Sequence, residues 1–246
     1  MKLCTYYTCG FPDMESSFKI IRAISEFSDY IEIGIPFSDP IADGPTIQLA
    51  SQKSLENGFR LKKAFPIINE LSKEFPTKKY LIMTYYNIIF QRKEDFIKKS
   101  KESGVWGIVV PDLPPGEDTE FEEKLQEKDI KTIFFVSPTT PKNRMKYISR
   151  RTTGFIYYIT VKGVTGERNK LPEDLVKKIQ EAKKITKKEV FAGFGISNAE
   201  QVKELKGVAD GVIIGSAIIK KVIESGSKDP TDDIKRFLGE IKENLV

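Results

Sequence analysis

Short hydrophobic runs rich in β-branched and aromatic residues alternate with longer, Lys- and Glu-rich amphipathic segments along the whole chain. The short runs are typical of buried strands, and the longer segments carry apolar residues at helical spacing. In residues 171–185, for example, Leu175, Val176, Ile179 and Ala182 fall on one helical face. The pattern predicts eight strands, at residues 3–8, 30–35, 80–86, 107–112, 131–137, 154–160, 189–195 and 211–216.

Eight strand–helix units occupy the 246 residues without a linker or a low-complexity stretch. About 250 residues is the typical size of a barrel in which eight parallel strands are surrounded by helices. The pattern therefore predicts one α/β domain, residues 1–246, with the (β/α)₈ TIM-barrel fold. A doubly wound open sheet is the alternative, because it is built from the same units, although it usually has fewer strands.

The unusual sequences all lie at the carboxyl ends of predicted strands or in the loops that follow them. They are rich in Pro or Gly, or carry several polar residues, and occupy 36–45, 111–115, 161–170, 193–195 and 215–216. The connections at the opposite end, such as 74–79, are plain polar turns. Because the active sites of TIM barrels lie at the carboxyl ends of the strands, we expect the functional site on this rim.

The composition excludes several classes of chemistry. The chain has no histidine, so Ser-His-Asp and Cys-His catalysis and His-ligated metal sites are excluded, and no metal is expected. The net charge of +5 comes from Lys and Arg residues interleaved with Glu, which indicates solvated helix faces rather than a nucleic-acid site. Proton transfer near neutral pH therefore has to use a carboxylate, Tyr, Lys or Cys.

Cysteine content and hydropathy bear on the cellular compartment. Cys4 and Cys9 have neither metal-site nor redox-motif spacing, and they are typical of reduced, partly buried thiols. No apolar run approaches the ~20 residues of a membrane span, and no secretory signal pattern is present. We expect a cytoplasmic protein.

Glu32 is the strongest catalytic candidate. Strand alternation places Ile31, Ile33 and Ile35 toward the helices, so that Glu32 and Gly34 face the barrel lumen. Desolvation should raise the pKa of such a carboxyl group, which suits a residue that gives and takes a proton. The alternative is a structural ion pair with a buried Lys or Arg, but the predicted strands carry almost no inward basic residue.

Two aspartates follow in the next loop. Asp39 and Asp43 lie in Ser-Asp-Pro and Ala-Asp-Gly-Pro sequences, which are also ordinary turn formers. A second carboxylate above a buried first one nevertheless resembles an acid/base pair with divided roles. The wetter environment expected for the loop would keep Asp43 ionised.

Glycines after the last three predicted strands indicate a phosphate site. Gly195 and Gly215 allow close backbone approach, and Ser216 opens a helix whose N–H groups can donate to an anion. Residues 163–166, which end at Gly166, could close over the phosphate. Each glycine taken alone could serve only the turn.

Five motifs together resemble the tryptophan synthase alpha chain family. They are IEIGIPFSDPIADGPTIQ at 31–48, VVPDLP at 109–114, GVTG at 163–166, GFGIS at 193–197 and GSA at 215–217. The resemblance implies retro-aldol cleavage of indole-3-glycerol phosphate to indole and D-glyceraldehyde 3-phosphate. It also implies catalytic roles for Glu32, which shuttles the proton, Asp43, which faces the indole nitrogen, and Tyr157 beside them.

Binding residues and partners follow from the same resemblance. It places the phosphate at Gly166, Gly195, Gly215 and Ser216, and the indole at Tyr6, Met83 and Phe194. No cofactor is implied in this chain, since pyridoxal phosphate belongs to a partner beta subunit, and an alpha2beta2 heterotetramer is expected. We expect Asp39 and Pro40, just outside the chemistry, to contact that partner.

Two departures from the family pattern keep other functions open. Val161 and Lys162 stand where bacterial members carry Arg and Ser, which bears on closure of the loop over the substrate, and Tyr6 replaces a usual Phe. The alternatives are another phosphate-binding barrel enzyme, such as a phosphoribosyl-processing isomerase, and a subunit that has lost catalysis and only activates its partner.

Overall fold

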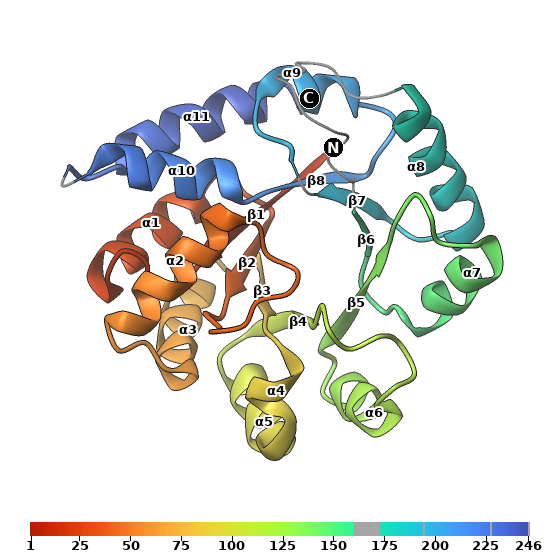
Figure 1. The fold of residues 1–246 in the computed structure, drawn as a ribbon, viewed down its shortest axis with the longest axis horizontal. Coiled ribbons are helices and arrows are strands. Elements are labelled where there is room, and N and C mark those ends of the chain that lie inside the picture. Colours follow the sequence, from red (N-terminus) through yellow and green to blue (C-terminus); the bar gives the residue numbers. More distant parts are fainter. Residues whose placement is uncertain (160–172, 194, 227, 246) are drawn as a thin grey trace.

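Eight parallel strands close into a barrel (Figure 1). The computed structural model describes residues 1–159, 173–193, 195–226 and 228–245. Each strand pairs with the next along the chain, and β8 pairs with β1. The closed barrel confirms the predicted TIM-barrel class and excludes the open sheet. The strands are β1 (Lys2–Thr8), β2 (Tyr30–Gly34), β3 (Lys79–Met83), β4 (Val105–Val109), β5 (Lys131–Val136), β6 (Ile156–Ile159), β7 (Val190–Gly193) and β8 (Gly211–Ile214).

Helices form a ring around the barrel (Figure 1). They are α1 (Met14–Phe27), α2 (Pro45–Glu56), η1 (Leu61–Lys63), α3 (Ala64–Glu74), α4 (Tyr86–Ile89), η2 (Phe90–Arg92), α5 (Lys93–Glu102), α6 (Thr119–Glu127), α7 (Lys142–Arg151), α8 (Glu173–Thr186), α9 (Ala199–Glu204), α10 (Ser216–Ser225) and α11 (Thr231–Glu243). The last helix, α11, packs on α1 and so closes the ring. The N-terminal amino group donates to the carbonyl of Leu245 at 3.2 Å, which brings the two chain ends together.

Side-chain caps define where several helices begin. The carboxylates of Asp13 and Asp118 accept the N–H groups of Ser16 and Phe121 at the starts of α1 and α6. Such caps satisfy N–H groups that the first helical turn leaves without a partner. Helix α2 instead begins with Pro45, whose fixed φ suits the first helical position.

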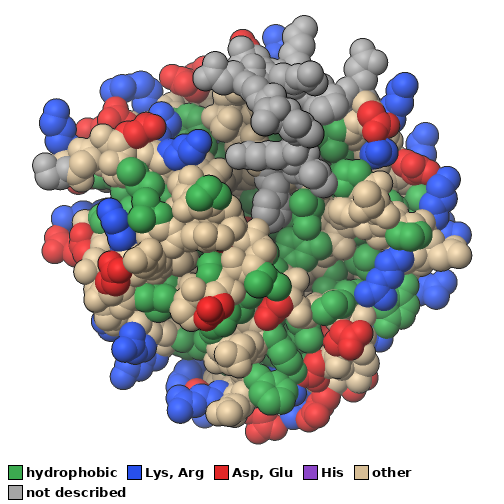
Figure 2. Space-filling view, in the orientation of Figure 1, with side chains coloured by type: hydrophobic (Ala, Val, Ile, Leu, Met, Phe, Trp, Pro, Cys, Tyr) green, Lys and Arg blue, Asp and Glu red, His purple; other side chains and the backbone are tan. Residues whose placement is uncertain are grey.

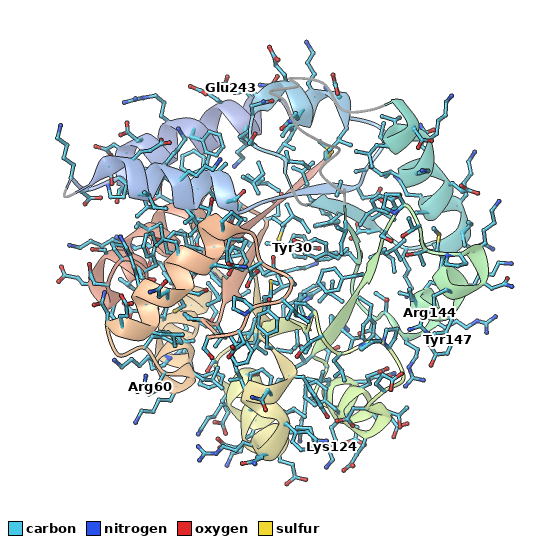
Figure 3. All side chains as sticks on the ribbon, in the orientation of Figure 1. Tyr30, Arg60, Lys124, Arg144, Tyr147 and Glu243 are labelled. Carbon is cyan, nitrogen blue, oxygen red and sulfur yellow. The ribbon has the colours of Figure 1, made fainter. Side chains whose placement is uncertain are left out.

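The apolar residues form two layers separated by the strands. One layer lies between strands and helices and contains Ile31, Ile33 and Ile35, as the alternation predicted. The other fills the lumen. In the lumen the ring of Phe155 stacks on that of Phe191, with ring centroids 4.0 Å apart, and Tyr30 contacts both rings edge-on. Figure 3 shows Tyr30 at the centre of the barrel, whereas the labelled Arg60, Lys124, Arg144, Tyr147 and Glu243 lie on the periphery.

Charged side chains occupy the outside of the ring. On the face shown in Figure 2, the described Lys and Arg residues are dispersed and interleaved with Asp and Glu, in agreement with solvated helix faces. None of the described helices is long and apolar enough to span a membrane.

Several predicted strands are too long at their carboxyl ends. The predicted 80–86 strand stops at Met83, and Tyr86 begins α4 because Asp112 accepts its N–H at 2.9 Å. The predicted 107–112 strand is shifted to Val105–Val109. Cys4 and Cys9 are free thiols as expected, but they are completely buried rather than partly so.

Candidate active site

A cavity of about 520 Å³ opens at the carboxyl ends of the strands. This volume falls within the range of small-molecule sites. The lining residues come from four strands and from the segments that follow β2, β7 and β8, and they are Tyr6, Ala42, Asp43, Gly44, Pro45, Thr46, Ile47, Met83, Tyr157, Ile159, Gly195, Ile196, Ile213, Gly215, Ser216 and Lys220. The predicted rim therefore carries a cavity with an apolar wall and few polar groups.

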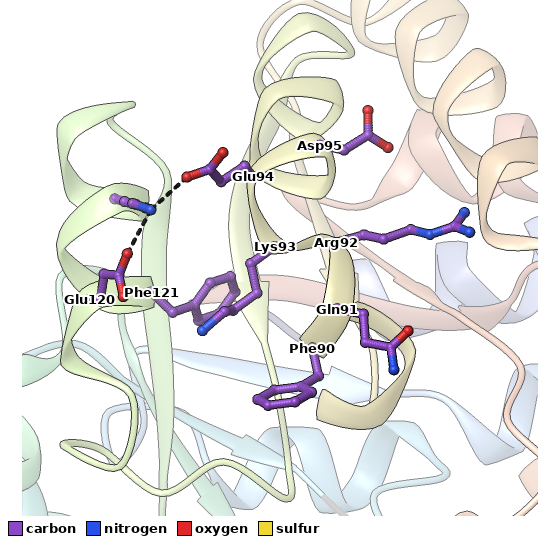
Figure 4. A pocket seen from close by; sticks show the side chains of 9 residues that line it. Phe90, Gln91, Arg92, Lys93, Glu94, Asp95, Glu120 and Phe121 are labelled. Carbon is purple, nitrogen blue, oxygen red and sulfur yellow. Dashed lines mark hydrogen bonds and ion pairs between the residues drawn. The ribbon is translucent and has the colours of Figure 1, made fainter.

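A second hollow of comparable size lies on the outer ring between η2, α5 and α6 (Figure 4). There Lys124 forms ion pairs with Glu94 and Glu120, at 2.8 and 2.7 Å. These are exposed pairs of a kind common on protein surfaces. None of the residues singled out from the sequence lines this hollow, so the central cavity is the candidate active site.

Glu32 lies in the lumen just beneath the cavity. It comes from β2 and is only 1% exposed, and neither carboxylate oxygen has a hydrogen-bond partner among the described residues. Burial, together with a smaller contribution from the negative charge of Asp43, raises the pKa of Glu32 from 4.5 to about 8. No described Lys or Arg forms a salt bridge with Glu32, so the structural ion pair does not occur in the described part of the chain.

Asp43 lines the cavity itself, in the segment between β2 and α2, and it is half-buried. Tyr85 donates its hydroxyl to Oδ2 of Asp43 at 3.1 Å. Burial raises the pKa of Asp43, and the Tyr85 hydrogen bond opposes that rise. Asp43 is thus less exposed to solvent than the sequence predicted. The two carboxylates still differ in environment, since one is enclosed and the other reaches the cavity.

Aromatic rings form the cavity wall, and glycines make room for them. A Cβ added to Gly34 or Gly215 would come within 2.2 or 2.9 Å of Tyr6. A Cβ on Gly193 would come within 2.6 Å of Tyr157. Burial, followed by the charge of Glu32, raises the pKa of Tyr157 well above its ordinary value. Tyr157 is therefore neutral and can only donate or accept a hydrogen bond near pH 7.

The predicted phosphate residues meet at one end of the cavity. Gly195 has φ +90°, a left-handed conformation that favours glycine. Gly215 follows β8 and precedes Ser216, the first residue of α10, so that helix begins at the cavity and has no side-chain cap there. Gly166, Phe194, Val161 and Lys162 lie outside the described residues.

Other predicted residues divide between the cavity and the surface. Tyr6 and Met83 line the cavity, whereas Asp39 is exposed and Pro40 half-buried outside it. Lys220 also lines the cavity and is not among the predicted site residues, although it falls on the same face of α10 as Ser216 four residues earlier. Tyr85 is not among them either, because the 80–86 run has the pattern of a continuous strand.

The fold and the cavity define the protein as a (β/α)₈-barrel enzyme with two carboxylates at the catalytic end and a helix N-terminus suited to an anion. The model of the family described as "Tryptophan synthase alpha chain" matches residues 1–245, and the chain belongs to this family.

Curated relatives and solved structures agree with this assignment. Tryptophan synthase alpha chains from Thermococcus kodakarensis and Pyrococcus furiosus are 41% and 42% identical, over 97% of this chain and 95% and 96% of their own lengths. A structure of the tryptophan synthase a2b2 complex from Pyrococcus furiosus contains a chain that matches with a TM-score of 0.91 and 41% identity. That match covers 98% of this chain and 97% of the other.

The family establishes the reaction. Its members are the subunit of tryptophan synthase that cleaves indole-3-glycerol phosphate to indole and D-glyceraldehyde 3-phosphate. The chain is therefore a carbon–carbon lyase of tryptophan biosynthesis. A phosphoribosyl-processing isomerase is excluded.

The burial of Glu32 predicts a pH-dependent stability. Between its unfolded pKa near 4.5 and its folded pKa of about 8, the unfolded chain releases a proton that the folded chain retains. The free energy of unfolding should therefore fall as pH rises through this window. The free energy of unfolding of Glu32→Gln, measured with urea, should equal that of the wild type at pH 4.5. At pH 8 it should exceed the wild-type value by on the order of 3 kcal/mol.

The exposed Glu127 provides the control, since Glu127→Gln should follow the wild type at both pH values. Parallel stability profiles for Glu32→Gln and the wild type would show that Glu32 is not desolvated.

Proposed function

We propose that Glu32 carries both proton transfers of the cleavage and that Asp43 stabilises the charge that develops on the indole ring. The observation that carries this proposal is the buried Glu32 carboxyl group, which has no partner among the described residues and a pKa near neutrality. A group with this pKa is present in both protonation states at working pH, as a general acid that later acts as a base requires.

Glu32 and Asp43 supply the proton transfers and the charge stabilisation that the cleavage requires. Protonated Glu32 gives its proton to indole C3, and positive charge develops at the ring N–H. The Glu32 carboxylate then takes the proton of the side-chain hydroxyl. The bond between indole C3 and the carbon that bears this hydroxyl breaks, and its electron pair returns to the indole ring. The hydroxyl-bearing carbon becomes the aldehyde carbon. Because Glu32 lies just beneath the cavity, it would reach the substrate by a change of side-chain rotamer.

Asp43 and Tyr157 would assist at opposite sides of the ring. The carboxylate of Asp43 lines the cavity, where a negative charge stabilises the cationic ring more strongly than it would in water. Tyr157, neutral and buried, would pack against the indole ring on the side of the cavity near Glu32. The indole would lie against Tyr6 and Met83, together with Phe194.

The substrate phosphate would bind at Gly195, Gly215 and Ser216, and at Gly166, which lies outside the described residues. Backbone N–H groups at a helix N-terminus and the Ser216 hydroxyl are suited to a phosphate. This binding energy is remote from the bond that breaks, so it can be used to hold the reacting end in place.

We further propose that the chain acts in the cytoplasm with a tryptophan synthase beta subunit, in an alpha2beta2 heterotetramer. The similar Pyrococcus furiosus chain is found in an a2b2 complex. Glu32 would account for both proton transfers and Asp43 for the developing charge, so this chain would need no metal or cofactor. Pyridoxal phosphate would belong to the beta subunit. Asp39 and Pro40, on the rim outside the cavity, are the proposed contacts.

Substitution of the carboxylates tests their roles. Glu32→Gln should keep the fold and the substrate affinity but remove nearly all cleavage, because an amide neither gives nor takes the proton. Asp43→Asn should be less severe, since an amide oxygen still accepts from the indole N–H. The test is steady-state cleavage of indole-3-glycerol phosphate by the purified chain. A Glu32→Gln variant with a tenth or more of the wild-type kcat would contradict the proton-shuttle role.

An added charge tests the phosphate site. Ser216→Asp should weaken binding of glycerol phosphate at least tenfold in titration calorimetry, because it places a negative charge beside the anion. Ser225→Asp, at the other end of α10, should bind as the wild type does. A crystal structure with the phosphate at the β1–β2 rim would overturn the assignment.

The partner should raise activity. Asp43, on the segment after β2, would be in place for only part of the time in the isolated chain, and docking would order it. We expect at least tenfold stimulation of cleavage by a beta subunit, about 1.4 kcal/mol. Pro40→Gly should lose the stimulation while keeping the unaided rate.

Pro76→Gly, in the turn at the opposite end of the barrel, should be stimulated normally. Equal turnover with and without compatible beta subunits would show a self-sufficient lyase. A chain without unaided activity that still stimulates the beta subunit would favour a purely activating role.

A further inference from the structure

The hydroxyl of Tyr85 joins two consecutive residues of the segment between β2 and α2. The N–H of Ala42 donates to it at 3.0 Å, and it donates to Oδ2 of Asp43 at 3.1 Å. One acceptor site and the only proton of the phenol are thus both used on the same short stretch of chain. Tyr85 is 3% exposed and follows the end of β3.

The ring of Tyr85 is itself fixed to the barrel. It stacks on Phe37 with ring centroids 5.1 Å apart and planes inclined by 28°. The preceding residue, Thr84, donates its N–H to the carbonyl of Val109 at 3.0 Å, which extends the pairing of β3 with β4. The hydroxyl is therefore presented from the rigid part of the fold.

The segment that carries Asp43 has few other anchors. Ser38 and Asp39 are exposed, and Ile41 is 81% exposed. The carbonyl of Asp43 accepts from Nε2 of Gln48 at 2.8 Å, but this bond holds the backbone and leaves the carboxylate direction open. Among the described residues, Tyr85 is the only hydrogen-bond partner of the Asp43 carboxylate.

We infer that Tyr85 is a positioning residue for the lyase reaction, which holds the carboxylate of Asp43 at the cavity wall through its hydroxyl. The bond to Oδ2 leaves Oδ1 without a hydrogen-bond partner among the described residues, so Oδ1 is free to accept the indole N–H. The inference rests on the role proposed above for Asp43. A carboxylate fixed before the charge develops stabilises it without a reorganisation cost.

The variant Tyr85→Phe removes the hydroxyl and keeps the ring that stacks on Phe37. It should lower kcat for indole-3-glycerol phosphate cleavage about tenfold, because the carboxylate is then in place for a smaller fraction of the time. KM should stay within about twofold, since the phosphate residues bind at the other end of the cavity. Tyr86→Phe is the matched control, because that hydroxyl bonds to Asp118 outside the cavity, and its kcat should be unchanged.

A double-mutant cycle separates positioning of Asp43 from a general structural effect. In an Asp43→Asn background, Tyr85→Phe should lower the single-turnover rate less than twofold, because the charged group that it holds is absent. The same tenfold loss in both backgrounds would overturn the inference, as would a Tyr85→Phe variant with wild-type kcat. If Asp43→Asn alone keeps the wild-type kcat, the role proposed for Asp43 fails, and the inference fails with it.

Urea unfolding of each variant shows whether it is folded before its rate is interpreted. A Tyr85→Phe variant whose kcat loss is confined to conditions of partial unfolding would also overturn the inference. Adding the beta subunit gives a second readout. A partner that orders the segment should restore part of the lost kcat in Tyr85→Phe, and no restoration is expected in Asp43→Asn.

Discussion

The enclosure of one carboxyl group in an apolar barrel is the constraint on which the site depends. Glu32 has no counter-ion and no hydrogen-bond donor among the described residues, so the folded chain favours its neutral form. A buried charge without a partner would cost several kcal/mol, and the shift of its pKa avoids most of this cost. The fold thus keeps one carboxyl group protonated near neutral pH in a chain that has no histidine.

The surrounding core has to be rigid for this enclosure to last. The aromatic rings of Phe155, Phe191 and Tyr30 fill the lower lumen, and Tyr6 and Tyr157 form the wall above it. Glycines opposite these side chains are required by packing, because a Cβ at Gly193 or Gly215 would come within 3 Å of a tyrosine side chain. Residues that look like turn glycines in the sequence therefore also set the shape of the cavity.

Hydrophobic periodicity predicted most of the fold, and it also predicted the buried position of Glu32. The alternation around Glu32 indicated its inward position, because in a barrel a period of two separates lumen from helix layer. Tyr85 and Lys220 were not predicted, for two different reasons. Tyr85 has the β propensity of a strand residue, but its role depends on where β3 ends. Lys220 is one of many surface lysines, and only the direction of α10 brings it to the cavity.

The two carboxylates differ because they stand on different kinds of structure. Glu32 belongs to a strand whose neighbours on both sides fix its register, so its burial persists as long as the barrel is closed. Asp43 stands on a connecting segment, and among the described residues only the Tyr85 hydroxyl forms a hydrogen bond with its carboxylate. The position of the proposed proton donor is therefore set by the fold itself, whereas the position of the proposed charge-stabilising group depends on a connecting segment. If Asp43 has the proposed role, a partner that bound this rim would alter the rate through Asp43 without disturbing the burial that raises the pKa of Glu32.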